Sequence, residues 1–164
     1  MPRINRQKMF MDMAEVVAQR GTCFRSCVGA ILTMDNNPIS MGYNGPPSGE
    51  DHCHGNECRL DETGGCLRAD HAEANAINRA TLILNKFDGL FDGRIDLYTT
   101  HAPCLDCAII ISKSLVDRLY YRHPYRNPQG LEIVLASTNV FRVLPSGTII
   151  GETTKQFINP ETLK

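Results

Sequence analysis

The segment from Asp51 to Ala76, DHCHGNECRLDETGGCLRADHAEANA, is crowded with side chains that bind soft metals. Its histidines and cysteines are His52, Cys53, His54, Cys58, Cys66 and His71. A tetrahedral zinc ion takes four ligands, so the segment offers more than one zinc can use. Most of it falls in a loop rich in Gly, Pro, Cys and His, and a loop of this length inside a compact domain needs a functional or metal-held explanation. We therefore expect bound metal to hold residues 44–70 in place.

Composition and charge limit the classes of protein that the chain can belong to. The 164 residues are best explained as one domain, residues 1–164, large enough to bury a full core. A net charge of −1 and a pI near 6.5 disfavour a nucleic-acid partner, because such domains are usually basic. There is no apolar run long enough for a membrane span and no secretory signal pattern. We expect a cytoplasmic protein with reduced thiols, so its seven cysteines indicate metal binding or catalysis before disulfides.

Helix and strand patterns alternate along the chain. Residues 127–139 are ambiguous, because LEIVLA has strand-like branching while Asn127-Pro128 suits a helix start; a helix is favoured there. Helices are also predicted over residues 5–19, from Asp70 and from Pro103. The apolar residues at helical spacing in the first of these are Met9, Met13, Val16 and Val17. Strands are predicted over residues 28–34, 39–43, 94–100, 117–121 and 140–144, with a short tail after a Pro-Ser-Gly turn. The alternation predicts an α/β sandwich of layers.

Two motifs carry the chemistry, HAE at residues 71–73 and PCLDC at residues 103–107. Cys104 and Cys107 lie at positions i and i+3, so a helix that begins near Pro103 presents both sulfur atoms on one face. A helix N-terminus lowers the pKa of a thiol and favours the thiolate that a metal needs. Two thiolates and the His71 imidazole fill three positions of a tetrahedron, and an open fourth position is typical of catalytic zinc.

Glu73 is interpreted as a proton shuttle beside the zinc-bound water. It lies two residues from His71, which is not same-face spacing in a helix, so it is a poor fourth ligand. The pattern H-x-E followed by P-C-x-x-C is the signature of zinc deaminases of nucleobases. Two non-catalytic interpretations stay open. The CxxC pair could be a structural or redox site, and Asp70-x-x-Glu73 could be a capping box at a helix start.

The chain also resembles the cytidine-deaminase superfamily over nearly its whole length. Within it, the chain is most similar to the deoxycytidylate (dCMP) deaminases of bacteria and phages, including the late-competence type. The motifs that carry the resemblance are RGTC at 20–23, VGA at 28–30, GYNG at 42–45, HC at 52–53, HAEANAI at 71–77 and PCLDC at 103–107. GYNG is not general to all zinc deaminases, so the set is specific when taken together.

The resemblance implies both a fold and a reaction. The fold is a three-layer α/β/α sandwich with a mixed five-stranded sheet. The reaction is hydrolysis of the 4-amino group of dCMP, which gives ammonia and dUMP for thymidylate synthesis. Glu73 would carry a proton from water to ring N3 and then assist the departure of ammonia. Family members commonly form hexamers that dCTP activates and dTTP inhibits, so a homo-oligomer with these effectors is expected.

Substrate contacts are expected from the GYNG loop and from residues beyond Cys107. An Asn-Gly pair usually makes a hairpin turn, but the prolines at 46 and 47 do not begin an ordinary hairpin strand, and the resemblance assigns Asn44 to the sugar. Tyr125 lies where the family places a tyrosine near the nucleotide. The phosphate needs cations, and Arg25 is selected from the nearby candidates Arg25, Arg68, Arg122 and Arg126.

The remaining cysteines can form a second metal site. Four of them supply the thiolates of a closed structural zinc site: Cys23, Cys53, Cys58 and Cys66. Such a zinc would tie down the long loop, and the resemblance implies a second zinc of this kind. His52 or His54 could replace one thiolate, and Cys27 is expected in the core. The alternative is a set of reduced, unligated thiols.

Other functions compete with dCMP deamination. They are deamination of another cytosine nucleotide or nucleoside (a modified dCMP, dCTP or cytidine), deamination of adenosine in tRNA, and a non-enzymatic zinc-binding module. A tRNA enzyme would have a basic surface and lack GYNG, and a nucleoside deaminase usually has CAE in place of HAE. The chain departs from its resemblance at residues 78–82, NRATL, where regulated members carry bulky and basic residues, and at Ala74, where Leu or Met is usual.

Overall fold

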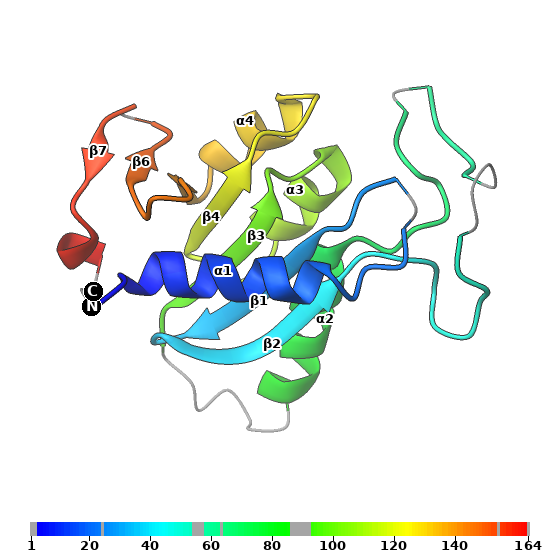
Figure 1. The fold of residues 1–164 in the computed structure, drawn as a ribbon, viewed down its shortest axis with the longest axis horizontal. Helices are drawn as coiled ribbons and strands as arrows, with labels where there is room; N and C mark the ends of the chain where they lie inside the picture. Colours follow the sequence, from blue (N-terminus) through cyan, green and yellow to red (C-terminus); the bar gives the residue numbers. More distant parts are fainter. Residues whose placement is uncertain are drawn as a thin grey trace.

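The computed structural model describes residues 3–23, 25–53, 58–62, 64–85, 93–153 and 155–163. A mixed sheet forms the middle layer of the molecule (Figure 1). Helix α1 (Arg6–Ala18) covers one face, and the other face is covered by α2 (Ala72–Leu84), α3 (Leu105–Ser112) and α4 (Gln129–Leu135). The predicted three-layer α/β/α sandwich is confirmed. Within the residues described, no helix is both long and apolar enough to span a membrane.

The sheet is mixed, with its parallel strands in the middle. The strand order is β2-β1-β3-β4-β5-β6-β7. The strands are β1 (Gly29–Met34), β2 (Asn37–Tyr43), β3 (Ile95–His101), β4 (Arg118–His123), β5 (Asn139–Val143), β6 (Ile149–Gly151) and β7 (Phe157–Ile158). β3, β4 and β5 are parallel, and all other neighbours are antiparallel. The last residues of β3 and β4, His101 and His123, therefore lie side by side at the edge of the sheet near which α3 begins.

Among the residues that the structure describes, the sheet has seven strands, where the resemblance implied five. The five expected strands are β1 to β5, and β6 and β7 extend the sheet beyond β5 through the segment expected as a tail. Gly147, with a φ of 90°, allows the tight turn that leads into β6. Strands of three and two residues are too short to show a period of two in the sequence, so only their pairing defines them.

Helix α1 forms where predicted but buries a different face. The Asn5 side-chain oxygen caps it by accepting the Lys8 N–H at 2.7 Å. The buried residues are Gln7, Phe10, Met11, Ala14 and Ala18, whereas Met9, Met13 and Val16 are exposed. Small alanines select this face because α1 lies so close to the sheet that a Cβ on Gly29 would be 2.1 Å from the Ala14 carbonyl oxygen. Of the predicted apolar stripe, only Val17 packs against the core.

An apolar core lies on each face of the sheet. Beneath α1, aromatic rings from α1, β3, β4 and β5 lie in a row with centroid separations of 5.1, 4.6 and 5.0 Å: Phe10, Tyr98, Tyr120 and Phe141. On the other face, apolar side chains of α2, α3 and α4 pack against Leu32, Leu97 and Leu119. Burial of this apolar surface stabilises the layers and holds the N-termini of α2 and α3 close together.

Candidate active site

Two helix N-termini position the predicted metal ligands. His71 is the N-cap residue of α2 and Cys104 is the N-cap residue of α3, both with extended backbone. Cys107 follows in the first turn of α3. The helices begin slightly later than the sequence predicts, so His71 and Cys104 lie just ahead of the first helical residue. The partial positive charge at each helix N-terminus favours a thiolate there.

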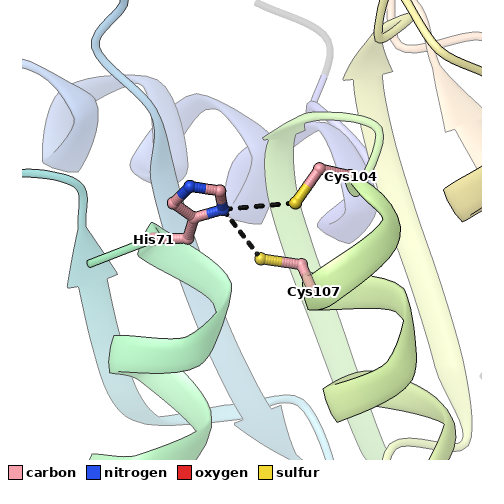
Figure 2. A group of neighbouring side chains, drawn as sticks. All are labelled: His71, Cys104 and Cys107. Atoms are coloured by element: carbon pink, nitrogen blue, oxygen red, sulfur yellow. Dashed lines mark hydrogen bonds between the residues drawn. The ribbon is translucent and has the colours of Figure 1, made fainter. Parts of the chain in front are cut away.

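The three side chains converge on one point (Figure 2). The Nδ1 atom of His71 lies 3.2 Å from the Cys107 Sγ and 3.3 Å from the Cys104 Sγ. Neighbouring nitrogen and sulfur ligands of a tetrahedral zinc lie about 3.5 Å apart, given Zn–N of about 2.0 Å and Zn–S of about 2.3 Å. Among the described residues this is the one group of metal-ligating side chains whose ligand atoms all lie within 4.8 Å of one another. The donor set and its spacing fit zinc.

The charge of the centre also fits a cation. Hydrogen bonds from Cys107 and then from His71 lower the pKa of the Cys104 thiol to about 4. The hydrogen bond to Cys104 raises the pKa of His71 to about 9. The hydrogen bond to Cys104, together with burial, raises the pKa of the Cys107 thiol. The centre therefore favours a thiolate whose charge a bound cation neutralises.

Glu73 lies beside this centre and is buried, with 5% of its surface exposed. Burial raises the pKa of its carboxyl group, and the Cys107 thiol donates a hydrogen bond to its Oε2 at 3.5 Å. The capping-box interpretation is wrong, because the N-cap residue of α2 is His71 and not Asp70, and His71 makes no side-chain capping hydrogen bond. Glu73 is thus a buried carboxyl group of raised pKa close to the metal ligands, which suits proton transfer.

A cavity of about 350 Å³ opens onto the centre. Its wall includes His71, Glu73 and Cys104 together with the three residues selected as substrate contacts. Those are Arg25, Asn44 and Tyr125, from segments far apart in the sequence. The cavity therefore brings the catalytic motifs and the predicted substrate contacts into one site.

Asn44 supports the cavity wall with both ends of its side chain. Its Oδ1 accepts the Val28 N–H at 2.8 Å, and its Nδ2 donates to the Ser26 carbonyl oxygen at 2.7 Å. These bonds hold the segment that leads into β1. One Nδ2 hydrogen and one Oδ1 lone pair remain for a ligand. The role of Asn44 in binding the sugar stays a prediction.

The candidate arginines separate into two groups. Arg25 and Arg126 line the cavity; Arg25 donates to the Gly64 carbonyl oxygen at 3.0 Å, and the Arg126 guanidinium lies 5.3 Å from the centre of the Tyr125 ring. Arg68 lies elsewhere, paired with Glu50 at 3.1 Å. Arg122 is buried against α1, where it pairs with Asp12 and Glu15 at 2.9 and 3.4 Å. Arg68 and Arg122 therefore do not face the cavity as phosphate ligands.

The four cysteines of the predicted second site are free thiols, and three of them act on the fourth. Partial burial and then the thiols of Cys23, Cys53 and Cys66 raise the pKa of Cys58. Their sulfur atoms do not all lie as close together as the ligand atoms of the His71 group, which are within 4.8 Å of one another. Cys27 is exposed, so its predicted place in the core is wrong; its thiol contacts the carbonyl oxygens of Gly21 and Cys23. His52 is exposed, and His54 lies outside the described residues.

Sequence reasoning missed His101 as a residue of the cavity wall. The residue ends β3 and stands three positions before Cys104. That position, between a buried strand and the PCLDC motif, was the available signal, because a residue just ahead of the motif can share the cavity wall with Cys104.

The comparisons with known proteins agree with this geometry. Residues 4–123 match the family described as the cytidine and deoxycytidylate deaminase zinc-binding region, and this range includes both HAE and PCLDC. ComE operon protein 2 of Bacillus subtilis is 36% identical over 134 residues, which cover 81% of this chain and 68% of that protein. The deoxycytidylate deaminase of Mycobacterium phage D29 is 34% identical over 131 residues, which cover 74% of this chain and 97% of that protein.

A solved structure shows the same similarity. The chain superposes on the dCMP deaminase of cyanophage S-TIM5, solved in complex with dCMP and dUMP, with a TM-score of 0.66 and 30% sequence identity. The match covers 83% of this chain and 95% of the cyanophage chain.

Proposed function

Because the chain belongs to the cytidine and deoxycytidylate deaminase zinc-binding family, we propose that it hydrolyses dCMP to dUMP and ammonia. One observation carries the proposal: buried Glu73 lies beside a zinc-ligand set in a cavity whose wall also holds Arg25 and Arg126. The substrate choice is supported by the phage enzymes named deoxycytidylate or dCMP deaminase, which are 30–34% identical to this chain.

The protein's own residues supply the proton transfers. A zinc ion held by His71, Cys104 and Cys107 would supply Lewis-acid chemistry that makes water a nucleophile near neutral pH. The Glu73 carboxylate accepts a proton from the water that attacks C4 of cytosine and delivers it to ring N3. The carboxylate then takes the remaining proton from the C4 hydroxyl group and passes it to the amino group; the C4–N bond breaks as C4=O forms, so water and dCMP become dUMP and ammonia. Burial of Glu73 keeps bulk water from competing for these protons.

The walls of the cavity suit a nucleotide better than a nucleoside. Arg25 and Arg126 provide two guanidinium groups for a phosphate, and guanidinium groups form strong, charge-assisted hydrogen bonds to phosphate oxygens. The free hydrogen and lone pair of Asn44 suit a sugar hydroxyl, and the half-buried Tyr125 offers an aromatic surface. A net charge of −1 gives no support for a tRNA substrate.

The test is ammonia release from a set of substrates. The protein, loaded with zinc, is incubated with dCMP, deoxycytidine, cytidine, dCTP and a tRNA anticodon stem. We expect the highest kcat/KM for dCMP, and the phosphate contacts predict a weaker reaction with deoxycytidine. No turnover of dCMP would refute the proposal, and a preference for deoxycytidine would identify a nucleoside deaminase.

A second, structural zinc bound by Cys23, Cys53, Cys58 and Cys66 is also part of the proposal. It is supported by the electrostatic effect of Cys23, Cys53 and Cys66 on the Cys58 thiol, whose pKa they raise. Such a zinc would hold residues 44–70. Metal analysis should give about two zinc ions per chain, and Cys58→Ser should lower this to one while the catalytic zinc stays. A value of one in the unaltered protein would refute this part.

Association into a homo-oligomer, a hexamer by resemblance, with dCTP and dTTP as effectors completes the proposal. It is supported by the exposed apolar side chains of Met9, Met13 and Val16 along α1, because contiguous exposed apolar surface favours association. Sedimentation and kinetics with and without each nucleotide test it. A monomer whose rate neither nucleotide changes would contradict this part of the proposal.

A further inference from the structure

His101 is a polar residue of the cavity wall to which the proposed reaction assigns no role. It ends β3, pairs in register with His123 of β4, and is partly buried. Its ring lies 5.1 Å from the His123 ring, measured between centroids. His123 is more exposed and lies outside the cavity wall, so of the two neighbouring imidazoles only His101 faces the substrate space.

A chain of hydrogen bonds places the Thr100 hydroxyl where it can donate to one ring nitrogen of His101. The Gly29 N–H donates to the Thr100 Oγ1 at 3.2 Å, and the Thr100 Oγ1 lies 3.1 Å from the His101 Nδ1. With one lone pair occupied by the Gly29 N–H, the Thr100 hydroxyl can direct its own hydrogen to Nδ1. A neutral imidazole that accepts at Nδ1 carries its hydrogen on Nε2. Among the described residues, Nε2 has no hydrogen-bond partner.

The surroundings of His101 favour this neutral form. Burial and then the neighbouring His123 lower the pKa of His101, and Glu15 on α1 opposes them more weakly. Glu15 is itself engaged by His123 at 3.3 Å and by Arg122. The charged or titratable groups that share the cavity wall with His101 include His71, Glu73, Cys104, Arg25 and Arg126.

We propose that His101 is a substrate-binding residue that donates its Nε2 hydrogen to an oxygen atom of the bound nucleotide. The proposal rests on the proposed deaminase function and adds a specificity residue to its cavity. Thr100 holds the ring in the donating tautomer, and its buried hydroxyl is anchored by the backbone of β1. The cavity thereby gains a fixed, uncharged donor beside its two arginines.

Two substitutions separate binding from a structural role. In His101→Gln the amide nitrogen can reach the position of Nε2, whereas in His101→Asn the shorter amide can reach only the position of Nδ1, next to Thr100. For dCMP we expect His101→Asn to raise KM about tenfold with a smaller change in kcat. His101→Gln should stay within about threefold of the unaltered KM. If His101 only makes a structural contact with Thr100, His101→Gln should raise KM more than His101→Asn does. That result would overturn the proposal.

Controls make the outcome independent of folding and of the main function. Both variants should keep the zinc content of the unaltered protein, and His123→Gln, which alters the neighbouring imidazole, should leave KM within twofold. The unaltered protein is assayed with dCMP separately. If it shows no turnover, the proposed function fails, and that result is distinct from a failure of the His101 proposal. Nitrogen NMR of the His101 ring gives a second test: the Nε2–H tautomer is expected, and dUMP should shift this nitrogen. An Nδ1–H tautomer, or no shift at saturating dUMP, overturns the proposal.

Discussion

Replacing Glu73 with Gln separates proton transfer from metal binding. Gln keeps the size and shape of the side chain but cannot accept a proton, so kcat for dCMP should fall by about 10²–10⁴-fold, the usual contribution of a general acid–base group. At 1.36 kcal/mol for each tenfold change, this is a loss of about 2.7–5.4 kcal/mol of transition-state stabilisation. Because the proposed metal ligands are His71, Cys104 and Cys107, the zinc content should not change.

The same substitution should not destabilise the fold. Glu73 is 5% exposed, and the side-chain hydrogen bond it accepts comes from a thiol, which is a weak donor. Burial raises the pKa of Glu73 above its ordinary value of 4.5. A carboxyl group whose pKa is raised on folding stabilises the protein fully below the unfolded pKa, and this contribution is lost as pH rises through the folded pKa. The metal-free Glu73→Gln variant should therefore unfold at a temperature at least as high as that of the unaltered protein at pH 7. The difference in stability between the two proteins should be smaller near pH 4.

Three measurements check this prediction. They are ammonia release from dCMP, zinc content, and thermal unfolding of the metal-free protein at pH 7 and pH 4. Glu132→Gln, an exposed position on α4, is the matched control and should leave all three unchanged. The reasoning is refuted if Glu73→Gln keeps more than a tenth of the kcat, or if it loses zinc.

Other positions give predictions of stability and metal binding. Asn44→Ala removes two hydrogen bonds of 2.7 and 2.8 Å and should lower the free energy of unfolding by about 2–4 kcal/mol in urea titrations; a change below 1 kcal/mol would contradict it. Gly29→Ala places a Cβ 2.1 Å from a carbonyl oxygen of α1 and should cost about 1–3 kcal/mol, seen as a lower Tm. Cys104→Ser should abolish binding of the catalytic zinc in metal analysis. Partial burial alone would raise the pKa of Asp12, but hydrogen bonds from Lys8 and Arg122 outweigh it and lower the pKa. Asp12→Asn should therefore cost less than about 1 kcal/mol at pH 7, and the difference in stability should vanish as pH falls through the lowered pKa.

The local motifs predicted the metal centre well because their chemistry is carried by few residues. Each motif lies at a recognisable helix start. Ligands at the starts of two helices can meet only if both helices lie on the same face of the sheet. Cys104 and Cys107 also have a fixed spacing, which the first turn of α3 preserves. The distances of 3.2 and 3.3 Å to His71 were not predictable, because they depend on how α2 and α3 pack on the sheet.

Polar residues away from the motifs were harder to place. Arg122 and Arg126 were equal candidates for the phosphate in the sequence, but the strand direction turns Arg122 toward α1 and its carboxylates, while Arg126 follows the end of β4 at the cavity. Cys27 precedes a buried strand yet is exposed. One residue of offset in a strand reverses the face of a side chain, so such assignments need the actual register.

The sequence by itself predicted the candidate zinc ligands and the candidate proton shuttle, and it determined the order of the helices and of the first five strands. These depend on residue chemistry and on local spacing, which tertiary structure leaves unchanged. Only the tertiary structure decided that α1 buries Phe10 and Ala14 in place of Met9 and Met13, that two short strands extend the sheet, and that His101 joins the cavity wall. Those features arise from contacts between residues that are distant in the sequence. Close packing on a glycine, or pairing at the end of a strand, selects one helix face or strand pairing among several that the local sequence pattern allows equally.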